Sequence, residues 1–571
     1  HDFLPSEILD SGENMYWGSG NQILRSARFV KNHEQLFGTY ITNFSCGPDS
    51  MLIPYFRKIM GNKPSLTLEL DSHSADAGLN TRIEAAVDII YRYRELSKKG
   101  MLDEPVNEFK IVEMHGDVII DSFGKKHNLR DKNVKVMIPN MGRFTTDVSS
   151  ATFRYGGINS EPLPINTFET LTAGRGLTTS KECIPLTLSV GAMAKHQFNN
   201  QNHDGITLIF MPTGCGPCRQ GQYNVYLKDI IAGKKLINHG ILTLTDEDSY
   251  SGLGNEIVLR GFTGVTIADV MQNIYSAIGA LAVDKKSALE LFDKEWGKIL
   301  VLIEKGTTKQ IYNQLKRSAS KFNSIKRIHS LNDAVKVVLV GEIFVRNEDF
   351  SRRELVQKLL EHNIVIKTAP IGEYLFYSNY LIKEQYKQHL PSLGNRMRFK
   401  LGEIIQRKVE LKIKNILDKS GFYEYESIDI ERIINHSKNL IPINMEGEAI
   451  LTIGSALADI VHHASGVVSL GPFGCMPSRV AESILNVNMN VNGKEAASGK
   501  PLQLSDRGIV NLPFLSVETD GNLFPQIIQS KLEIFILQTT RFHKLLKKSN
   551  EEKQRHYQSP ASSARHYVKI I

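Results

Sequence analysis

The cysteines of this chain lie in loops that suit ligands or reactive thiols. Cys215 and Cys218 follow an apolar run, 206–211, that predicts a buried strand, and they precede a helical pattern over 223–231. A proline, which suits the first turn of a helix, stands two residues after four of the five cysteines: Cys46, Cys183, Cys215 and Cys475. A thiol just ahead of a helix lies at the positive end of the helix dipole, which favours the thiolate, the form that binds metals.

Three kinds of metal or redox chemistry fit these thiols. A structural zinc site usually shows two close pairs of cysteines, whereas only Cys215 and Cys218 are close here. An iron–sulfur cluster accepts scattered thiolates that the fold brings together. A redox disulfide between Cys215 and Cys218 stays an alternative. So does the packing of all five cysteines as small buried hydrophobic residues.

A polar cluster follows the predicted strand 64–71. It consists of Glu69, Asp71, His73 and Asp76. Ligands of open α/β sheets bind at the carboxyl ends of the strands. We therefore expect Glu69, His73 and Asp76 to transfer protons or position a substrate beside the cysteines. The alternative is a solvated loop that caps a helix.

Two further glutamates, Glu342 and Glu518, are weaker candidates at comparable strand ends. The sequence contains neither the glycine-rich Walker pattern nor a G-x-G-x-x-G motif after a strand. If ATP takes part, we therefore expect another chain or another segment to bind it.

The composition describes a multidomain globular chain. The chain has 571 residues, of which 41% are hydrophobic. A chain of this length is too long for a single core. The formal net charge of +8 is mild for this size and does not indicate a nucleic-acid partner. The sequence has no apolar run of roughly 18 residues, so no membrane span is expected. Five cysteines form no disulfide framework, and a reducing cytoplasm is the expected compartment. Because the chain starts with His1, we expect a processed product or a segment of a longer polypeptide.

The elements around the cysteines alternate between strand and helix. Residues 40–76 predict a strand, the Cys46 loop, a helix over 49–60, a second strand and the polar loop. This order is typical of parallel α/β units. The predicted fold class is therefore α/β, with several Rossmann-like parallel-sheet lobes around a central cluster cleft and a helical insertion. The expected segments are an N-terminal α/β lobe over 1–130, a lobe over 131–254, a helical subdomain over 255–330, α/β lobes over 331–440 and 441–541, and a basic tail over 542–571.

A short internal repeat relates the two ends of the chain. Residues 66–71 match residues 515–520, and residues 81–84 match residues 530–533. Each copy lies downstream of a cysteine–x–proline loop. The repeat predicts two lobes of similar fold that face a shared cleft.

Several longer motifs together resemble a known family. The sequence resembles the acyl-CoA dehydratase activase-related proteins, relatives of the 2-hydroxyacyl-CoA dehydratase and double-cubane-cluster reductases, from about residue 20 to 540. The motifs that carry the resemblance are Cys46-Gly-Pro-Asp-Ser50, Glu69-Leu-Asp-Ser-His-Ser-Ala-Asp-Ala-Gly78, Thr81-Arg82, Lys181-Glu-Cys183, Gly216-Pro-Cys-Arg219, Gly221-Gln-Tyr223, Gly341-Glu-Ile343 and Pro472-Phe-Gly-Cys-Met-Pro477.

The resemblance implies an iron–sulfur protein with Rossmann-like lobes that an ATP-hydrolysing iron–sulfur activase reduces, either as a separate chain or as a fused module. It carries over four cluster ligands, Cys46, Cys183, Cys218 and Cys475, and leaves Cys215 as an extra candidate. Gln220 and the segment 478–482 depart from the family pattern. Five cysteines also fall short of the six that a double cubane needs, which favours a single [4Fe–4S] cluster.

The expected function is that of an iron–sulfur oxidoreductase or dehydratase-like component that passes low-potential electrons to a small molecule. The alternative is a non-catalytic scaffold with a structural metal or packed thiols. The identity of the substrate and the formation of a homo-oligomer are left open.

Overall fold

The computed structural model describes residues 15–43, 47–71, 74–102, 109–179, 181–199, 205–214, 216–244, 253–388, 393–502, 504 and 508–558. The chain divides into two compact units, which are described separately. Unit 1 comprises 1–140, 153–258 and 473–476, and unit 2 comprises 141–152, 259–472 and 477–571. The short segment that carries Cys475 therefore belongs to unit 1.

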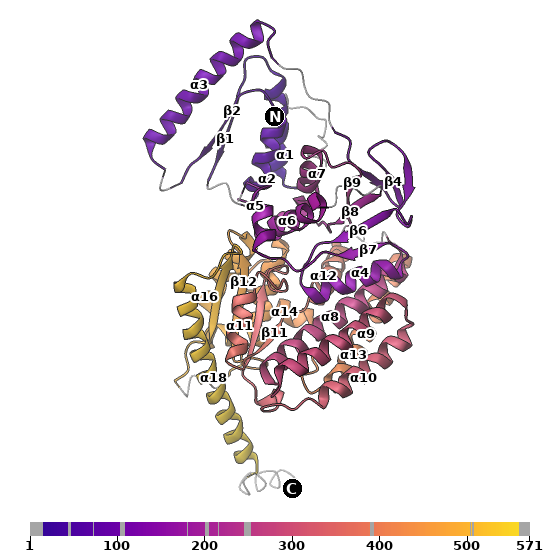
Figure 1. The fold of residues 1–571 in the computed structure, drawn as a ribbon. Coiled ribbons are helices and arrows are strands. Elements are labelled where there is room, and N and C mark those ends of the chain that lie inside the picture. Colours follow the sequence, from indigo (N-terminus) through magenta and orange to yellow (C-terminus); the bar gives the residue numbers. More distant parts are fainter. Residues whose placement is uncertain are drawn as a thin grey trace. The chain divides into compact units, whose positions relative to one another are not determined.

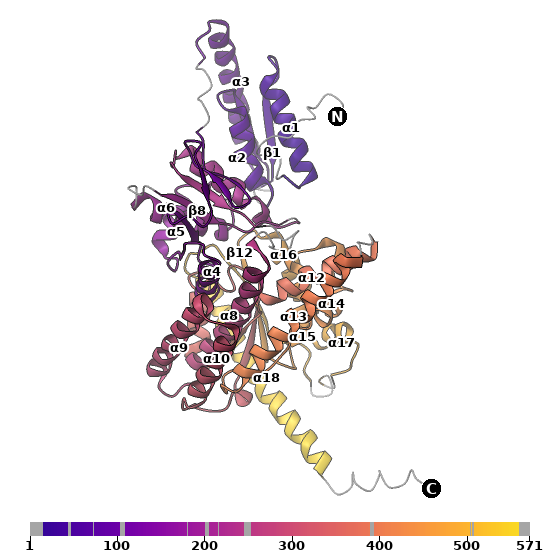
Figure 2. The ribbon, with the colours of Figure 1, turned by 90° about the vertical axis from the view of Figure 1, so that its right-hand side faces the viewer.

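The first part of unit 1 is a small α/β layer around two parallel strands. Its elements are α1 (Gly18–Asn32), β1 (Gly38–Thr42), α2 (Asp49–Met60), β2 (Ser65–Glu69) and α3 (Asp76–Lys98). The two strands pair in parallel from Gly38 opposite Ser65 to Thr42 opposite Glu69. In Figures 1 and 2 the strands lie between α1 and α3. The predicted order of strand, helix, strand and helix is confirmed.

The second part of unit 1 contains a four-stranded parallel sheet. Its order is β7–β6–β8–β9, and a three-stranded antiparallel sheet, β3–β4–β5, accompanies it. The strands are β3 (Glu113–His115), β4 (Val118–Ile120), β5 (Lys126–Asn128), β6 (Val134–Ile138), β7 (Ser160–Pro162), β8 (Ile206–Phe210) and β9 (His239–Leu242). The helices are α5 (Phe168–Arg175), α6 (Ile184–Asn199), the 3-10 turn η1 (Arg219–Gln222) and α7 (Tyr223–Gly233), and α4 (Arg143–Tyr155) runs mostly in unit 2.

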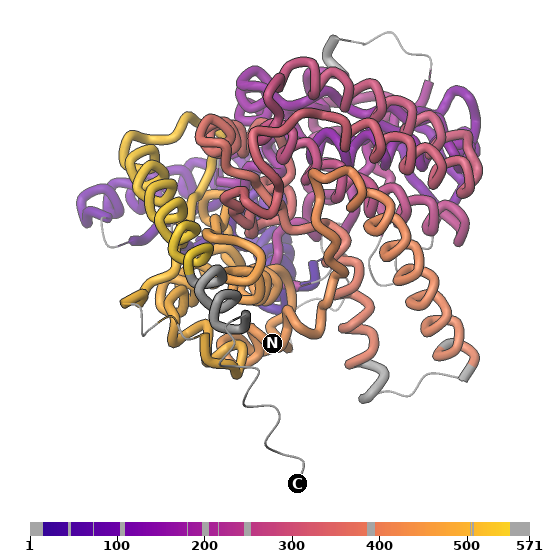
Figure 3. The backbone as a smooth tube through the Cα atoms, turned by 90° about the horizontal axis from the view of Figure 1, so that it is seen from below, coloured from indigo at the N-terminus to yellow at the C-terminus, as the bar shows by residue number. Residues whose placement is uncertain are grey.

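Unit 2 begins with three long helices, as the sequence predicts for 255–330. They are α8 (Asn255–Leu281), α9 (Lys285–Lys305) and α10 (Thr308–Asn323), which run side by side in Figure 3. Asp284 and Thr307 cap the second and third helices through their side chains. The aromatic residues Phe292, Trp296 and Phe322 are fully buried among these helices.

The remainder of unit 2 is built on a second parallel sheet. Its order is β11–β10–β12–β13, so the lobes expected over 331–440 and 441–541 share one sheet. The strands are β10 (Lys336–Gly341), β11 (Val365–Thr368), β12 (Gly466–Pro472) and β13 (Phe514–Thr519). The helices are α11 (Arg353–Glu361), α12 (Gly372–Gln388), α13 (Leu393–Asp418), α14 (Ile430–Ser437), α15 (Glu448–Asp459), α16 (Met476–Asn488), α17 (Val491–Ser498) and α18 (Gln526–Gln558), with the 3-10 turns η3 (Leu331–Asp333) and η4 (Ile443–Met445).

The two four-stranded sheets share one topology. In each, the first strand in the sequence is central, the second pairs on one side, and the third and fourth follow on the other side. The strand order therefore reverses between β6 and β8 in unit 1 and between β10 and β12 in unit 2. Such switch points form crevices at the carboxyl ends of the strands. The α/β fold class with parallel-sheet lobes is confirmed.

The repeated segments of the sequence occupy equivalent elements. Residues 66–71 cover most of β2, and residues 515–520 cover most of β13. Each is the second strand of a parallel pair, and the first strand of each pair, β1 or β12, leads into a cysteine loop. Within the described residues, no helix is long and apolar enough to cross a membrane.

Candidate functional site

Three of the cysteines lie in the described part of unit 1, each at the start of a helix. Cys183 directly precedes α6, and Cys475 directly precedes α16. Cys218 caps η1 by accepting the backbone N–H of Gln220, 3.5 Å from its Sγ. The predicted position of these thiols at helix N-termini is therefore confirmed. Cys46 and Cys215 lie outside the described residues.

Arg219 is the residue that gathers these loops. Its side chain is buried, and its guanidinium donates to the Ser50 hydroxyl at 3.0 Å. It also donates to the backbone carbonyls of Lys181 at 3.3 Å and Gly474 at 3.4 Å. Ser50 is the second residue of α2, and the two carbonyls lie in the Cys183 loop and in the Cys475 loop. One buried cation thus links three cysteine-bearing segments of the sequence.

The charge of Arg219 matches its surroundings. Burial by itself would lower the pKa of the guanidinium, which would be unfavourable for a buried cation. The pKa is instead raised above its ordinary value, because four side chains that can carry negative charge surround it: Cys183, Tyr223, Cys475 and Cys218. The guanidinium therefore stays charged despite its burial.

Tyr223 contacts one of the thiols directly. Tyr223 is the first residue of α7, and its hydroxyl lies 2.5 Å from Cys183 Sγ. Burial raises the pKa of this tyrosine well above its ordinary value, and the negative charge of Cys183 and Cys218 raises it further. The hydroxyl therefore stays protonated at neutral pH and can donate to a thiolate.

Polar side chains hold the Cys218 loop in place. The Tyr16 hydroxyl donates to the carbonyl of Cys218 at 2.5 Å, and the Trp17 indole N–H donates to the carbonyl of Gly216 at 3.1 Å. Gly216 has a φ of +122°, a backbone conformation that favours glycine. The loop is thus fixed by contacts with residues about 200 positions earlier in the sequence.

A second anchor holds the Cys183 loop. The Glu182 carboxylate accepts the backbone N–H groups of Thr179 and Lys181, and it accepts the Tyr226 hydroxyl at 2.7 Å. Lys181 Nζ in turn lies 2.9 Å from Glu69 Oε1, at the end of β2. Because both side chains of this last pair are about one-third exposed, it positions the loop more than it stabilises the fold.

One of the predicted proton-handling residues is joined to a cysteine loop. The ion pair with Lys181 brings Glu69 to the residues just before Cys183. Asp76 is exposed at the first turn of α3, and Asp71 accepts a hydrogen bond from Ser74. His73 lies outside the described residues. Of the three predicted residues, Glu69 is therefore the one that the described structure joins to a cysteine loop.

The spacing of the thiols is informative. A single zinc ion with bonds of about 2.3 Å holds its sulfur ligands about 3.8 Å apart. Among the described residues, Cys183, Cys218 and Cys475 do not form a group with ligand atoms all within 4.8 Å of one another. The described thiols therefore do not have the spacing of ligands to a single zinc ion.

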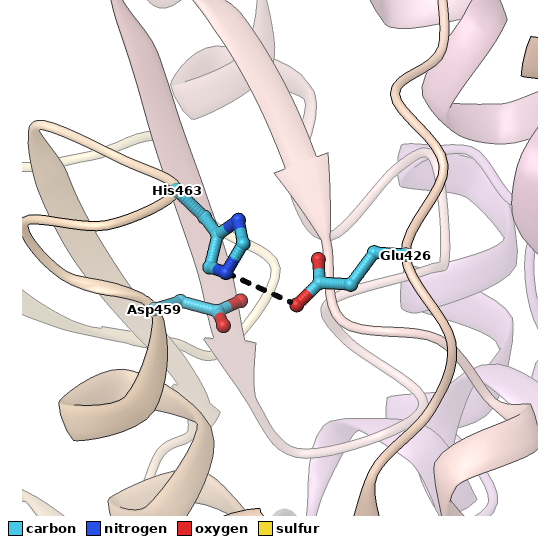
Figure 4. A group of neighbouring side chains, drawn as sticks. All are labelled: Glu426, Asp459 and His463. Atoms are coloured by element: carbon cyan, nitrogen blue, oxygen red, sulfur yellow. Dashed lines mark ion pairs between the residues drawn. The ribbon is translucent and has the colours of Figure 1, made fainter. Parts of the chain in front are cut away.

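Unit 2 contains the one such close group in the described part of the chain. Glu426, Asp459 and His463 converge there, and Figure 4 shows their side chains pointing toward one another. His463 Nε2 lies 3.5 Å from Glu426 Oε1. Both carboxylates already form ion pairs with Lys367 and Arg432. These two cations neutralise the carboxylates, so the group is a structural ion-pair network rather than a metal site.

This network borders a small cavity of about 110 Å³ in unit 2, which Asp269 also lines. The Asp269 carboxylate accepts the backbone N–H groups of Ile371 and Gly372, both at 2.9 Å, at the start of α12. Burial nevertheless raises the pKa of Asp269 from 3.8 to about 6. The positive charges of Lys414 and Arg346 lower the pKa of Asp269 and so offset part of this rise.

The raised pKa of Asp269 predicts a pH dependence of stability. The folded state binds the proton more tightly than the unfolded state, so this stabilisation is complete below pH 4 and is lost as the pH rises to 6. The change corresponds to at most about 3 kcal/mol. The free energy of unfolding of unit 2, measured with denaturant between pH 4 and 7, should fall with rising pH in the wild type. In an Asp269→Asn variant this pH-dependent loss should be absent. Parallel pH profiles of variant and wild type would contradict the assignment.

The weaker glutamate candidates lie in unit 2. Glu342 follows β10, and its buried carboxylate accepts the backbone N–H of Val345 at 2.9 Å. Burial raises its pKa. Glu518 lies within β13, and its carboxylate is 3.3 Å from the Arg479 guanidinium.

Comparison with known proteins adds no relative. No protein-family model matches the chain, and no curated protein matches it.

Proposed function

We propose that unit 1 binds one iron–sulfur cluster and that the protein is the reductase component of a low-potential electron-transfer reaction. The observation that carries the proposal is the buried guanidinium of Arg219 among Cys183, Cys218 and Cys475. A buried positive charge close to three cysteines supports their role as metal ligands, because the thiolate is the form that binds metal. Cys46 is the fourth proposed ligand, because its loop leads into α2, where Ser50 accepts from Arg219.

The residues around the thiols suit such a group. The Tyr223 hydroxyl and the Arg219 guanidinium supply hydrogen-bond donors and positive charge next to sulfur. Hydrogen bonds to the sulfurs and net charge are the features that set the reduction potential of a cluster. When bound, the cluster supplies one-electron transfer at potentials that reach about −700 mV.

The reaction partners follow from the family resemblance. The proposed electron donor is an ATP-hydrolysing iron–sulfur activase, and the proposed acceptor is a small molecule bound beside the cluster. Glu69 is the proposed proton-handling residue, because its ion pair with Lys181 ties it to the Cys183 loop. His73 and Asp76 stay candidates from the sequence.

Anaerobic metal analysis tests the proposal. The protein purified or reconstituted without oxygen should be brown and should contain about four iron and four sulfide per chain. Single serine substitutions of Cys46, Cys183 and Cys218 should remove the cluster. Retention of the cluster in Cys475→Ser would indicate a three-cysteine site with one open iron, which could bind the substrate directly.

Cys215→Ser is the matched control, and it should keep its iron. Loss of iron in this variant alone would mean that Cys215, rather than Cys218, is the ligand. A colourless protein without iron after reconstitution, or one that binds only zinc, would contradict the proposal. That result would favour a non-catalytic scaffold whose thiols hold a structural metal or pack in the core.

A further inference from the structure

The cavity in unit 2 runs along β11, the edge strand of the second parallel sheet. Both the first and the last residue of this strand, Val365 and Thr368, line it. Helix α8 covers the open edge of the strand, because the Asn273 side chain accepts the backbone N–H of Thr368 at 2.9 Å. The cavity then reaches Glu373 in the first turn of α12. It therefore includes the carboxyl end of a parallel strand, the place where ligands of open α/β sheets bind.

The carboxylates that line this cavity are paired with basic side chains, with two exceptions. The paired ones are Glu373, Glu424, Glu426 and Asp459. The first exception, Asp429, is exposed and caps α14 through its side chain. The second is Asp269, whose carboxylate forms no ion pair with any basic side chain in the described part of the chain. The lining thus has one enclosed negative charge without a counter-ion.

The Asp269 carboxylate has room for a further hydrogen-bond donor. One of its oxygens accepts the backbone N–H of Ile371, and the other accepts that of Gly372. A carboxylate has about four lone-pair positions, so about two are left. These two neutral donors do not compensate for burial, since the pKa of Asp269 is still raised to about 6. A donor that carries positive charge would stabilise the ionised carboxyl group.

Much of the remaining wall is apolar or aromatic. Val270, Ala369 and Phe422 are buried and line the cavity. Tyr423 lines it as well, and burial raises the pKa of its hydroxyl well above the ordinary value. Nearby carboxylates, Asp269 among them, raise this pKa further, so the hydroxyl stays neutral and its oxygen can accept a hydrogen bond. Aromatic rings also attract cations. An inorganic cation would need several oxygen ligands, whereas these walls suit a short alkyl group.

We infer that this cavity binds a small molecule that carries a primary ammonium group, with Asp269 as its counter-ion. The ammonium group donates to the Asp269 carboxylate and to the Tyr423 oxygen, and the alkyl part lies against the apolar wall. The volume of about 110 Å³ limits the ligand to a few non-hydrogen atoms.

An anionic ligand fits this cavity less well. Each of the cations in the lining already has a carboxylate partner: Lys336, Lys367, Lys414 and Arg432. Figure 4 shows part of this network, the side chains of Glu426, Asp459 and His463. All the lining residues belong to unit 2, so the inference does not depend on the proposed cluster.

Ligand-observed NMR titration of the full chain with ethylammonium chloride, at pH 7.5 and constant ionic strength, tests the inference. The wild type should bind one ethylammonium ion per chain. Asp269→Asn, which removes the charge and keeps the shape, should weaken binding at least about tenfold. Tyr423→Phe, which keeps the ring, should weaken it about threefold. A wild type that does not bind, or an Asp269→Asn variant that binds equally well, would overturn the inference. If circular dichroism shows Asp269→Asn to be unfolded, unchanged binding in Tyr423→Phe has the same consequence.

The matched control is Glu290→Gln, which removes one exposed carboxylate of α9 outside the cavity. It should bind ethylammonium as the wild type does. Potassium and acetate should not displace ethylammonium, and tetrapropylammonium, which has the same charge but more bulk, should bind at least about tenfold more weakly. Displacement by potassium or by acetate would mean that the site takes an inorganic cation or an anion. Equal binding of tetrapropylammonium would place the interaction on the exposed acidic surface. Each of these three results would overturn the inference.

Discussion

An Arg219→Met variant is expected to retain less than about a tenth of the iron that the wild-type protein binds after anaerobic reconstitution. Methionine has a similar length but cannot supply charge or donate hydrogen bonds. The site of Cys183, Cys475 and Cys218 would lose its buried cation, which offsets the negative charge of thiolate ligands.

The same substitution should destabilise unit 1. It leaves the Ser50 hydroxyl and the carbonyls of Lys181 and Gly474 without their buried donor. The expected loss is about 3 kcal/mol in the free energy of unfolding. The fluorescence of Trp17, which contacts the Cys218 loop, measures the unfolding of unit 1. The measurement uses a Trp296→Phe background, which removes the only other tryptophan in the sequence.

Two control variants separate charge from packing. Arg219→Lys keeps the charge but loses the planar fork that reaches several acceptors, so it should recover part of the iron. Ser50→Ala removes one hydrogen bond, and it should cost about 1 kcal/mol while retaining the iron. If Arg219→Met binds iron as the wild type does, the guanidinium has no role in holding the thiolates.

The sequence predicted the local elements of the cysteine site well. Apolar runs bounded by turn residues located β2 and β8, and the helix after Cys183 begins at Ile184 as expected. These elements could be predicted because a buried strand and an amphipathic helix each leave a periodic pattern in a short window. The helical subdomain predicted over 255–330 was likewise visible from its pattern.

Long-range pairing could not be predicted in the same way. Strands β10 and β12 are more than 120 residues apart, and no short window records that they pair. The antiparallel strands β3, β4 and β5 were missed because each has only three residues. In addition, β3 and β5 consist mostly of charged or polar residues. A buried contact of Asp121 with His127, 2.9 Å apart, fixes this small sheet.

The role of Arg219 was also missing from the sequence interpretation. Its position directly after Cys218 was a usable signal, because a basic residue next to a thiol favours the thiolate. The acceptors that bury it come from positions 50, 181 and 474, and only the fold brings them together.

The second large effect is expected in unit 2, where Arg346→Leu should lower the free energy of unfolding by about 3–5 kcal/mol. Arg346 and Glu373 form a buried ion pair at 2.8 Å, with side chains 1% and 2% exposed. The guanidinium also donates to the carbonyl of Gly341 at 2.8 Å. Leucine would leave the Glu373 carboxylate buried without its cation. Trp296 fluorescence in a Trp17→Phe background measures the unfolding of unit 2.

The defect of Arg346→Leu should depend on pH and should be relieved by a second substitution. Burial already raises the pKa of Glu373, and Arg346 opposes this effect. Without Arg346 the folded-state pKa rises further, so stability is retained below about pH 4.5 and lost as the pH rises through that higher pKa. Adding Glu373→Gln removes the buried charge and should recover at least about half of the loss at pH 7. Lys547→Ala, which breaks an exposed ion pair with Asp333, should cost less than about 1 kcal/mol at any pH. An Arg346→Leu defect that is the same at pH 5 and pH 8, or that Glu373→Gln deepens, would show that lost packing rather than an uncompensated charge is the cause.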